Sequence, residues 1–341
     1  MTPSTIDNPI RHLFIIGNGF DLAHNYPTSY NNFRDYLTDR FPGSDEYDEL
    51  VPESTTMPDG EEKYDEDEIA GYVSRILDDC SGGDWGNLEA YLGSPVINSL
   101  VSDLDLLDPD DDSDKNLRHA YYNNVDRSTH MFATFPHVKD FFCDWIMDYY
   151  SGFNYGLNKL ISRNKSIDWK SDIDEVLKEG DGFLDLNYTM TLEQVYGIDE
   201  RNICHVHGKV GDCKEDIFLG HGEEDGEVEA FEILGAESNL TNLKRLLYKD
   251  TADAWNRHLD FFDRIGGDLV DIHSYGFSFS DVDLYYAERI AEIVDTAKVT
   301  WYINKFTDSE RNSGTRKGRV LNEQIKKVEV LGFKVVADNR W

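Results

Sequence analysis

The chain has 341 residues, 40% of them hydrophobic and 13% aromatic, so it can bury a sizeable core as one large domain or two modest ones. Its 67 acidic and 33 basic residues give a formal net charge of −34, which repels phosphate backbones and argues against nucleic-acid binding. We interpret the acidity as that of a solvated surface.

The N-terminal sequence and the cysteines both favour a reducing compartment. MTPSTIDNPIR contains no apolar run typical of a secretory signal, and no window of the chain is apolar enough for a membrane span. The four cysteines stand at positions 80, 143, 204 and 213, without a CxxC pair or a disulfide-like spacing. We therefore expect a cytoplasmic protein without a membrane partner.

The first predicted element is a buried strand over residues 12–17, followed by the turn Gly17-Asn18-Gly19 and a helix-like stretch. The two glycines permit positive φ and close backbone approach, and the N–H groups that follow could hold a diphosphate. The third glycine of the dinucleotide fingerprint is replaced by Leu22, and no clear ribose-binding acid follows at the expected spacing. A tight turn without a ligand is the alternative.

Residues 31–180 are predicted to form a helical insertion with acidic loops. Residues 45–68 are acidic and broken by prolines, which is typical of a surface loop, and residues 116–164 are mostly helical in pattern. Glu89 is expected on the polar face of an amphipathic helix. Apolar residues recur at helical spacing in two segments: Ile69, Val73, Ile76 and Leu77, then Trp85, Leu88 and Leu92.

The α/β pattern returns near residue 181. FLDL predicts a strand before Asn187, NICHVHG a strand ending at His207-Gly208, and DIFLGHG a third, weaker strand. Residues 228–263 are predicted to be helical, and DLVDIHSYGFSFS predicts a strand ending near Tyr275-Gly276. VTWYINK and KVEVLGFKVV contribute the last strands.

Ser280 and Asp283 form a capping box before a predicted helix. Its apolar stripe contains Val282, Tyr286, Ile290 and Ile293. Strands that alternate with helices predict an α/β, Rossmann-like fold with a mostly parallel sheet covered on both faces. Residues 1–30 and 181–341 would form this nucleotide-binding core.

Unusual residues follow the predicted strands. In open parallel sheets ligands bind beyond the carboxyl ends of the strands, so the turns at 17–19, 187, 207–208 and 275–276 would lie along one edge. His207 titrates near neutrality and suits the role of general base. The alternatives are that Asn187 is an ordinary turn former and that His207 is a structural strand-end histidine.

Cys204, His205, His207, Cys213 and His221 are residue types that bind zinc. Cys204 and His207 are three residues apart on a strand and would point to opposite faces. His205 and His207 would share a face, but no second pair has the spacing of a ligand pair. We therefore expect no metal.

Six motifs occur in the order found in the bacteriophage abortive-infection AbiH family, which the chain resembles from about residue 12 to 305. They are IIGNGFDLAHNYPTSYNNF, WGNLEAYLG, FLDLNYTMTLE, HVHG, LGHG and YGFSFSDVDLYY. That family in turn resembles sirtuin-like NAD-binding proteins of anti-phage defence. The resemblance implies NAD as substrate or ligand, with Asn187 and His207 as catalytic residues. The implied nucleotide-binding residues are Gly17, Asn18, Gly19, Phe20, Asp21, Tyr30, Gly208, Gly276, Ser278 and Asn304.

The chain departs from the sirtuin-like pattern in two ways. It has Asn187-Tyr188-Thr189 where such NAD hydrolases usually have Asn-Tyr-Asp. It also lacks the four-cysteine zinc module of sirtuin deacetylases, which argues against deacetylation.

The leading hypothesis is an anti-phage effector that hydrolyses the nicotinamide–ribose bond of NAD, with Asp21 or Asp185 shielding positive charge in the transition state. It would be restrained at rest, by homo-oligomer geometry or by residues 45–68, until a phage-derived trigger acts. The second hypothesis is a non-catalytic sensor of NAD or ADP-ribose, which Thr189 favours. The third is a nucleic-acid-directed toxin, against which the charge of −34 argues.

Overall fold

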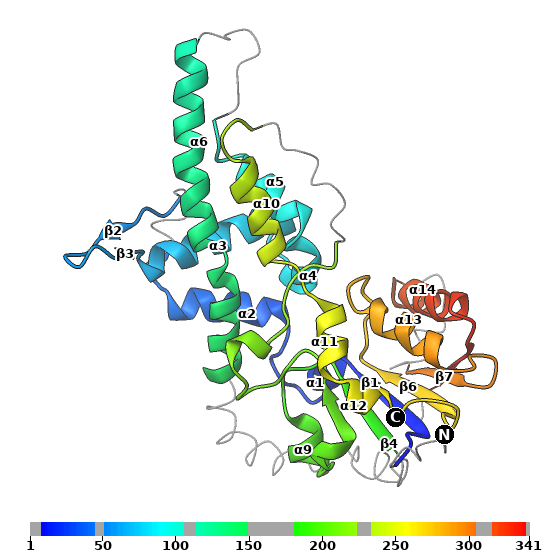
Figure 1. Ribbon diagram of the computed structural model, residues 1–341. Coiled ribbons are helices and arrows are strands. Elements are labelled where there is room, and N and C mark those ends of the chain that lie inside the picture. The colour runs from blue at the N-terminus through cyan, green and yellow to red at the C-terminus, as the bar shows by residue number, and fades with distance from the viewer. Residues whose placement is uncertain are drawn as a thin grey trace, which may run out of the picture. The chain divides into compact units, whose positions relative to one another are not determined.

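The computed structural model describes residues 8–44, 51–105, 114–148, 181–223, 233–304 and 316–338 (Figure 1). Contacts divide the chain into two compact units, one of residues 1–28, 146–218 and 250–341 and the other of residues 29–145 and 219–249. This division differs from the predicted insertion, because residues 219–249 group with the helical unit. They contribute helix α10 (Glu237–Leu246), which packs on α5 (Ser94–Val101) and α6 (Asp114–Thr134).

The first unit is built on a six-stranded sheet in the order β5-β4-β1-β6-β7-β8, with every neighbouring pair parallel. The strands are β1 (His12–Ile16), β4 (Asp181–Asp185), β5 (Ile203–His205), β6 (Asp271–Tyr275), β7 (Thr300–Asn304) and β8 (Lys334–Asp338). Counted along the chain this is the doubly wound order 3-2-1-4-5-6, whose winding reverses between β1 and β6. The predicted Rossmann-like α/β fold is confirmed.

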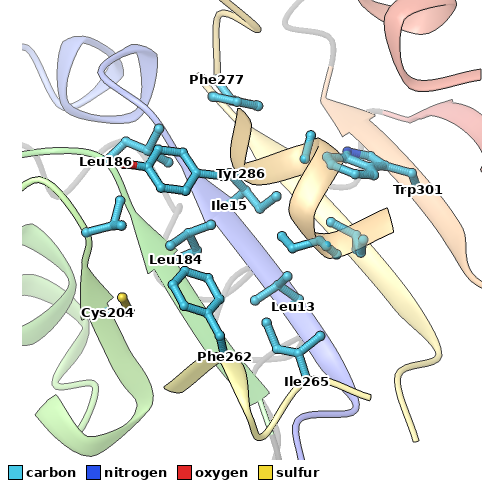
Figure 2. Packing of buried hydrophobic residues seen from close by; sticks show 14 of the residues in the cluster. Leu13, Ile15, Leu184, Leu186, Cys204, Phe262, Ile265, Phe277, Tyr286 and Trp301 are labelled. Carbon is cyan, nitrogen blue, oxygen red and sulfur yellow. The ribbon is translucent and has the colours of Figure 1, made fainter. Parts of the chain in front are cut away.

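Successive strand residues point to opposite sheet faces, and both faces are covered. One face carries Leu13, Ile15 and Leu184 and packs on four helices, a core shown in Figure 2. Those helices are α11 (Thr251–Arg257), α12 (Leu259–Phe262), α13 (Leu284–Ile293) and α14 (Arg316–Val330). The other face carries Phe14 and Ile16 and packs on α1 (Gly19–Ala23) and α9 (Thr191–Tyr196). The 3-10 turns η3 (Glu200–Asn202) and η4 (Lys214–Asp216) flank β5.

The second unit is mainly helical. Besides α5, α6 and α10 it contains α2 (Tyr30–Arg40), α3 (Glu66–Ser81), η2 (Trp85–Asn87), α4 (Leu88–Tyr91) and a hairpin of β2 (Thr55–Thr56) and β3 (Glu62–Lys63). The N-terminus of α3 is capped by the Asp65 carboxylate, and Gly82 ends the helix in the left-handed conformation. The apolar positions predicted on both helical faces, from Ile69 to Leu92, are buried. No helix among the described residues has the length and apolarity to cross a membrane.

Several sequence expectations are wrong or incomplete. DIFLGHG forms no strand, only one bridge between His221 and Tyr248, because the chain passes from the first unit to the second after Phe218. Ile293 was predicted in the buried apolar stripe of the helix after Ser280, but it is 40% exposed because α13 ends at this residue. Glu89 does not lie on a polar face but is buried, 2.8 Å from the Lys249 ammonium.

Three other expectations are met in part. The helical pattern predicted for 116–164 is present over 116–134 and 137–148, and the remainder lies outside the described residues. The acidic loop of 45–68 contains the exposed β2–β3 hairpin and the first turn of α3, while residues 45–50 lie outside the description. The first part of KVEVLGFKVV belongs to α14, and only its end forms β8.

Candidate functional site

The turn after β1 packs directly on the turn after β6. The Gly17 N–H donates to the Tyr275 carbonyl at 2.9 Å, and the Gly19 N–H donates to the Gly276 carbonyl at 3.1 Å. A Cβ on Gly17 or Gly19 would lie 2.6 Å from Gly276 atoms, and Gly276 has φ of +63° with Phe20 N only 2.3 Å from its would-be Cβ. These glycines are therefore needed for the contact between the turns, whether or not a ligand binds.

Three N–H groups of the loop from Gly17 to Asp21, which was predicted to hold a diphosphate, are already used within the chain. Besides those of Gly17 and Gly19, the Phe20 N–H donates to the Gly17 carbonyl at 2.9 Å. The Asn18 side chain bonds to Thr28, whose carbonyl accepts at 2.8 Å and whose hydroxyl donates at 2.6 Å. Diphosphate binding by these three N–H groups thus requires their present hydrogen bonds to break.

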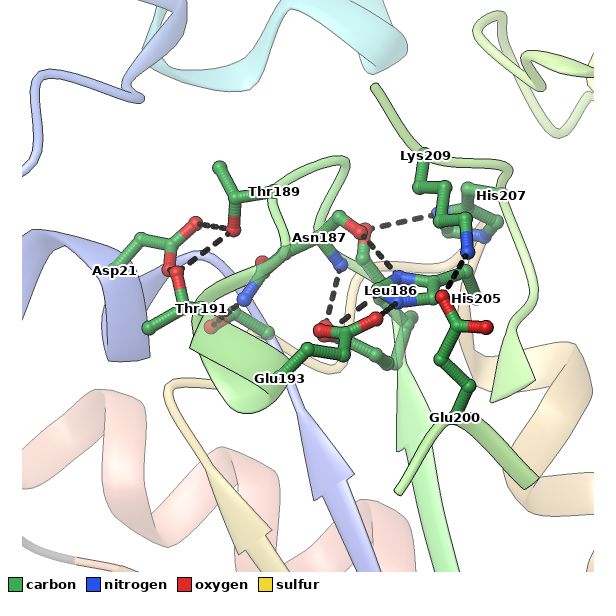
Figure 3. A network of polar contacts seen from close by, with 12 residues as sticks. Asp21, Leu186, Asn187, Thr189, Thr191, Glu193, Glu200, His205, His207 and Lys209 are labelled. Atoms are coloured by element: carbon green, nitrogen blue, oxygen red, sulfur yellow. Dashed lines mark hydrogen bonds and ion pairs between the residues drawn. The ribbon is translucent and has the colours of Figure 1, made fainter. Parts of the chain in front are cut away.

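Asp21 lies in α1 with its carboxylate buried. The Thr189 hydroxyl donates to one carboxylate oxygen at 2.6 Å, and the Thr191 hydroxyl donates to the other at 2.7 Å (Figure 3). Burial raises the pKa of Asp21 to about 6, although both hydroxyls lower it. In an Asn-Tyr-Asp sequence the aspartate would stand at position 189. Here Thr189 stands there and instead binds the carboxylate of Asp21 from α1.

A second buried cluster lies at the ends of β4 and β5. His205 Nε2 is 2.8 Å from Glu193 Oε1 of α9, and His205 Nδ1 is 3.8 Å from Asp185 Oδ2. Burial raises the pKa of Asp185 to about 8. Burial lowers the pKa of His205, but the hydrogen bond to Glu193 raises it, and the net effect is a raised pKa. Burial raises the pKa of Glu193, but the hydrogen bond from His205 lowers it, and the net effect is a lowered pKa.

Asn187 and His207 follow these two strands. The Asn187 side-chain Nδ2 donates to the Gly17 carbonyl at 3.3 Å, which ties the turn after β4 to the turn after β1. His207 Nδ1 lies 3.3 Å from the Leu186 carbonyl, and its Nε2 lies 3.5 Å from Asp283 Oδ1. Asn187 and His207 are only 4% and 2% exposed, so a substrate reaches them only after a local movement.

His205 and His207 do not share a face, contrary to the sequence prediction. His205 contacts α9, whereas the His207 ring lies 5.5 Å from that of Tyr286 in α13, on the other face of the sheet. The reason is that β5 ends at His205, so strand alternation stops there. No group of three or more His, Cys, Asp or Glu side chains in the described parts of the chain is arranged to hold a metal ion.

Asp283 lies beside His207 and was not predicted as a candidate site residue. Its only signal was the capping box, and the Ser280 hydroxyl does accept the Asp283 N–H at 3.2 Å. That turn brings the carboxylate to His207. Asp185, considered only as a source of charge, also contacts the Asn187 main chain.

The remaining predicted residues are more scattered. Gly208 has φ of +80°, and a Cβ there would lie 2.3 Å from the Asp216 carbonyl oxygen. The exposed Ser278 accepts the Ser280 N–H, and Asn304 ends β7, with no hydrogen-bond partner for its buried amide atoms among the described residues. Tyr30 begins α2 and belongs to the second unit.

The comparisons with known proteins give one match. A family model described as bacteriophage abortive infection AbiH matches residues 13–305. No curated protein and no solved structure matches the chain. The matched range starts within β1 and ends just past β7, so it contains every candidate site residue described above.

Proposed function

The chain belongs to the bacteriophage abortive infection AbiH family, and on that premise we propose that it hydrolyses the nicotinamide–ribose bond of NAD⁺. Abortive infection of phage-infected cells is the role that its family gives it. Hydrolysis of a cytoplasmic dinucleotide is our proposal for the chemistry behind that role. One observation supports it most: Asn187, His207 and the buried carboxyls of Asp21 and Asp185 gather at the carboxyl ends of β1, β4 and β5.

Two features of this cluster of Asn187, His207, Asp21 and Asp185 favour catalysis over a purely structural role. Ionisable groups with strongly shifted pKa values cluster at functional sites, and Asp21 and Asp185 are shifted to about 6 and about 8. The groups also lie next to the point between β1 and β6 where the sheet reverses its winding, which is where doubly wound sheets bind ligands.

In the proposed reaction a water molecule attacks C1′ of the ribose, and nicotinamide leaves with the electron pair of the broken C–N bond. Asn187 orients the water and the ribose, while His207 accepts the proton that the water loses and later releases it to solvent. Asp283 orients the His207 ring. The ionised Asp21 carboxylate shields the positive charge of the oxocarbenium-like transition state.

Asp21 also bears on the choice between hydrolase and sensor. A sensor that binds NAD or ADP-ribose without cleavage is favoured by Thr189 and by the closed state of Asn187 and His207. The hydroxyl of Thr189, however, holds the Asp21 carboxylate at 2.6 Å, so negative charge is present beside Asn187 without an Asn-Tyr-Asp sequence. The carboxylate supports the hydrolase.

The test incubates purified protein with NAD⁺ and a lysate of phage-infected cells and follows nicotinamide and ADP-ribose by chromatography. We expect release by the wild type and a rate lower by about 10² to 10⁴ in His207→Ala, the usual contribution of a positioned base. His221→Ala is a matched control, because His221 is a buried histidine of the second unit. Release that is equal in His207→Ala and wild type would refute the role of His207. Calorimetric binding of NAD⁺ without release would favour the sensor.

A further inference from the structure

The main chain of Asn187 is held as firmly as its side chain. Its N–H donates to Asp185 Oδ1 at 2.9 Å, and its carbonyl oxygen lies 3.4 Å from His205 Nδ1 (Figure 3). Its side-chain amide bonds to the Gly17 carbonyl at 3.3 Å. Asn187 is therefore fixed at three points, two of which are titratable side chains.

The two titratable side chains are paired by the sheet itself. Asp185 of β4 and His205 of β5 are direct partners in the parallel register, so they stand side by side on the same face. Glu193 of α9 holds the far nitrogen of His205 at 2.8 Å. Asn187, two residues after the end of β4, thus contacts a carboxyl group and an imidazole that the sheet register positions.

We propose that Asp185 and His205 are positioning residues, which hold the Asn187 main chain so that its side-chain amide is aimed at the ribose and the attacking water. The proposal rests on the hydrolysis proposed above, because it explains how Asn187 is oriented for that reaction. Neither side chain touches the substrate. A displacement of about 1 Å of a catalytic group costs up to about 10²-fold in rate, so loss of this hold is measurable.

The same arrangement keeps the hold when Asp185 changes its charge. Asp185 faces His205, Asp21 of α1 and Glu193 of α9. The charge of Lys209 also acts on Glu193, and the charge of His205 acts on His258. The Asp185 carboxyl keeps its proton up to about pH 8. When it ionises, its Oδ1 becomes a stronger, charge-assisted acceptor for the Asn187 N–H, so the hold on the Asn187 main chain persists above about pH 8.

The first measurement is amide hydrogen exchange at Asn187 in the full chain. Asp185→Ala removes the acceptor, and we expect exchange to quicken about tenfold, the effect of losing one buried hydrogen bond. Asp185→Asn keeps an acceptor oxygen and should restore most of the protection. The control is Asp181→Ala, because Asp181 is a buried aspartate at the start of the same strand. Unchanged exchange in Asp185→Ala would overturn the proposal.

The second measurement is turnover of NAD⁺ by the same variants in infected-cell lysate. We expect kcat to fall by about 10²-fold in Asp185→Ala with little change in KM, and to recover in Asp185→Asn. Faster exchange with an unchanged kcat would overturn the positioning role. If the wild type releases no nicotinamide, the proposed hydrolysis fails, while the exchange measurement still decides whether Asp185 holds Asn187. If Asp185→Ala does not fold, turnover by His205→Ala decides, because His205 holds the Asn187 carbonyl, and an unchanged kcat in that variant contradicts the proposal.

Discussion

Asp185 illustrates how a single buried group makes stability depend on pH. Its pKa is raised by burial from 3.8 to about 8, so between these values the folded chain keeps a proton that the unfolded chain releases. The free energy of unfolding therefore falls as pH rises from about 4 to about 8. Asp185→Asn cannot ionise, and we expect it to become progressively more stable than wild type over this range, on the order of a few kcal/mol at pH 8. Denaturant unfolding at several pH values measures the difference.

The control for this prediction is Asp199→Asn. Asp199 is exposed, and its hydrogen bonds with Arg201 lower its pKa to about 2, so it is ionised in both states above about pH 5. Its replacement should leave the pH dependence between 5 and 8 unchanged. Parallel stability curves for wild type and Asp185→Asn over that range would mean that Asp185 is ionised in the folded protein.

At the scale of the element, the close contact between the turns after β1 and β6 predicts that Gly276 is more sensitive to substitution than Gly197. Gly276 has φ of +63° and no room for a Cβ, whereas Gly197 has φ of +69° with nothing within 4 Å of a Cβ. Gly197→Ala should cost about 1 kcal/mol for the left-handed backbone alone. Gly276→Ala adds a clash with the Phe20 main chain and should cost about 3 kcal/mol in total. Thermal unfolding compares the two, and equal losses would show that the turns do not need their close contact.

Elements were predictable from the sequence where the pattern is local. The apolar residues before Gly17 and Asn187 predicted two of the strands, because a strand buried on both faces is typically apolar. The ends of elements were less predictable, and the early end of β5 separates His205 from His207. Contacts between distant segments, such as Asp21 with Thr191 or His207 with Asp283, leave no periodic signal in the sequence and required the fold.

At the scale of the whole molecule, the burial of the candidate site would limit the proposed hydrolysis in a resting cell. Uncontrolled NAD⁺ loss would kill the host, and Asn187 and His207 are almost completely buried in the structure. A resting chain of this kind is expected to turn over little NAD⁺ until a phage-derived trigger opens the site. The predicted restraint by an oligomer or by residues 45–68 stays a prediction.

The most direct measurement is the NAD⁺ content of cells that express the chain, followed by mass spectrometry before and after phage infection. We expect normal NAD⁺ in uninfected cells and a fall before lysis in infected cells with the wild type, but no fall with His207→Ala. His221→Ala, a change in the second unit, should behave as the wild type. Protection from phage with constant NAD⁺ would contradict the account, and so would an equal fall in His207→Ala.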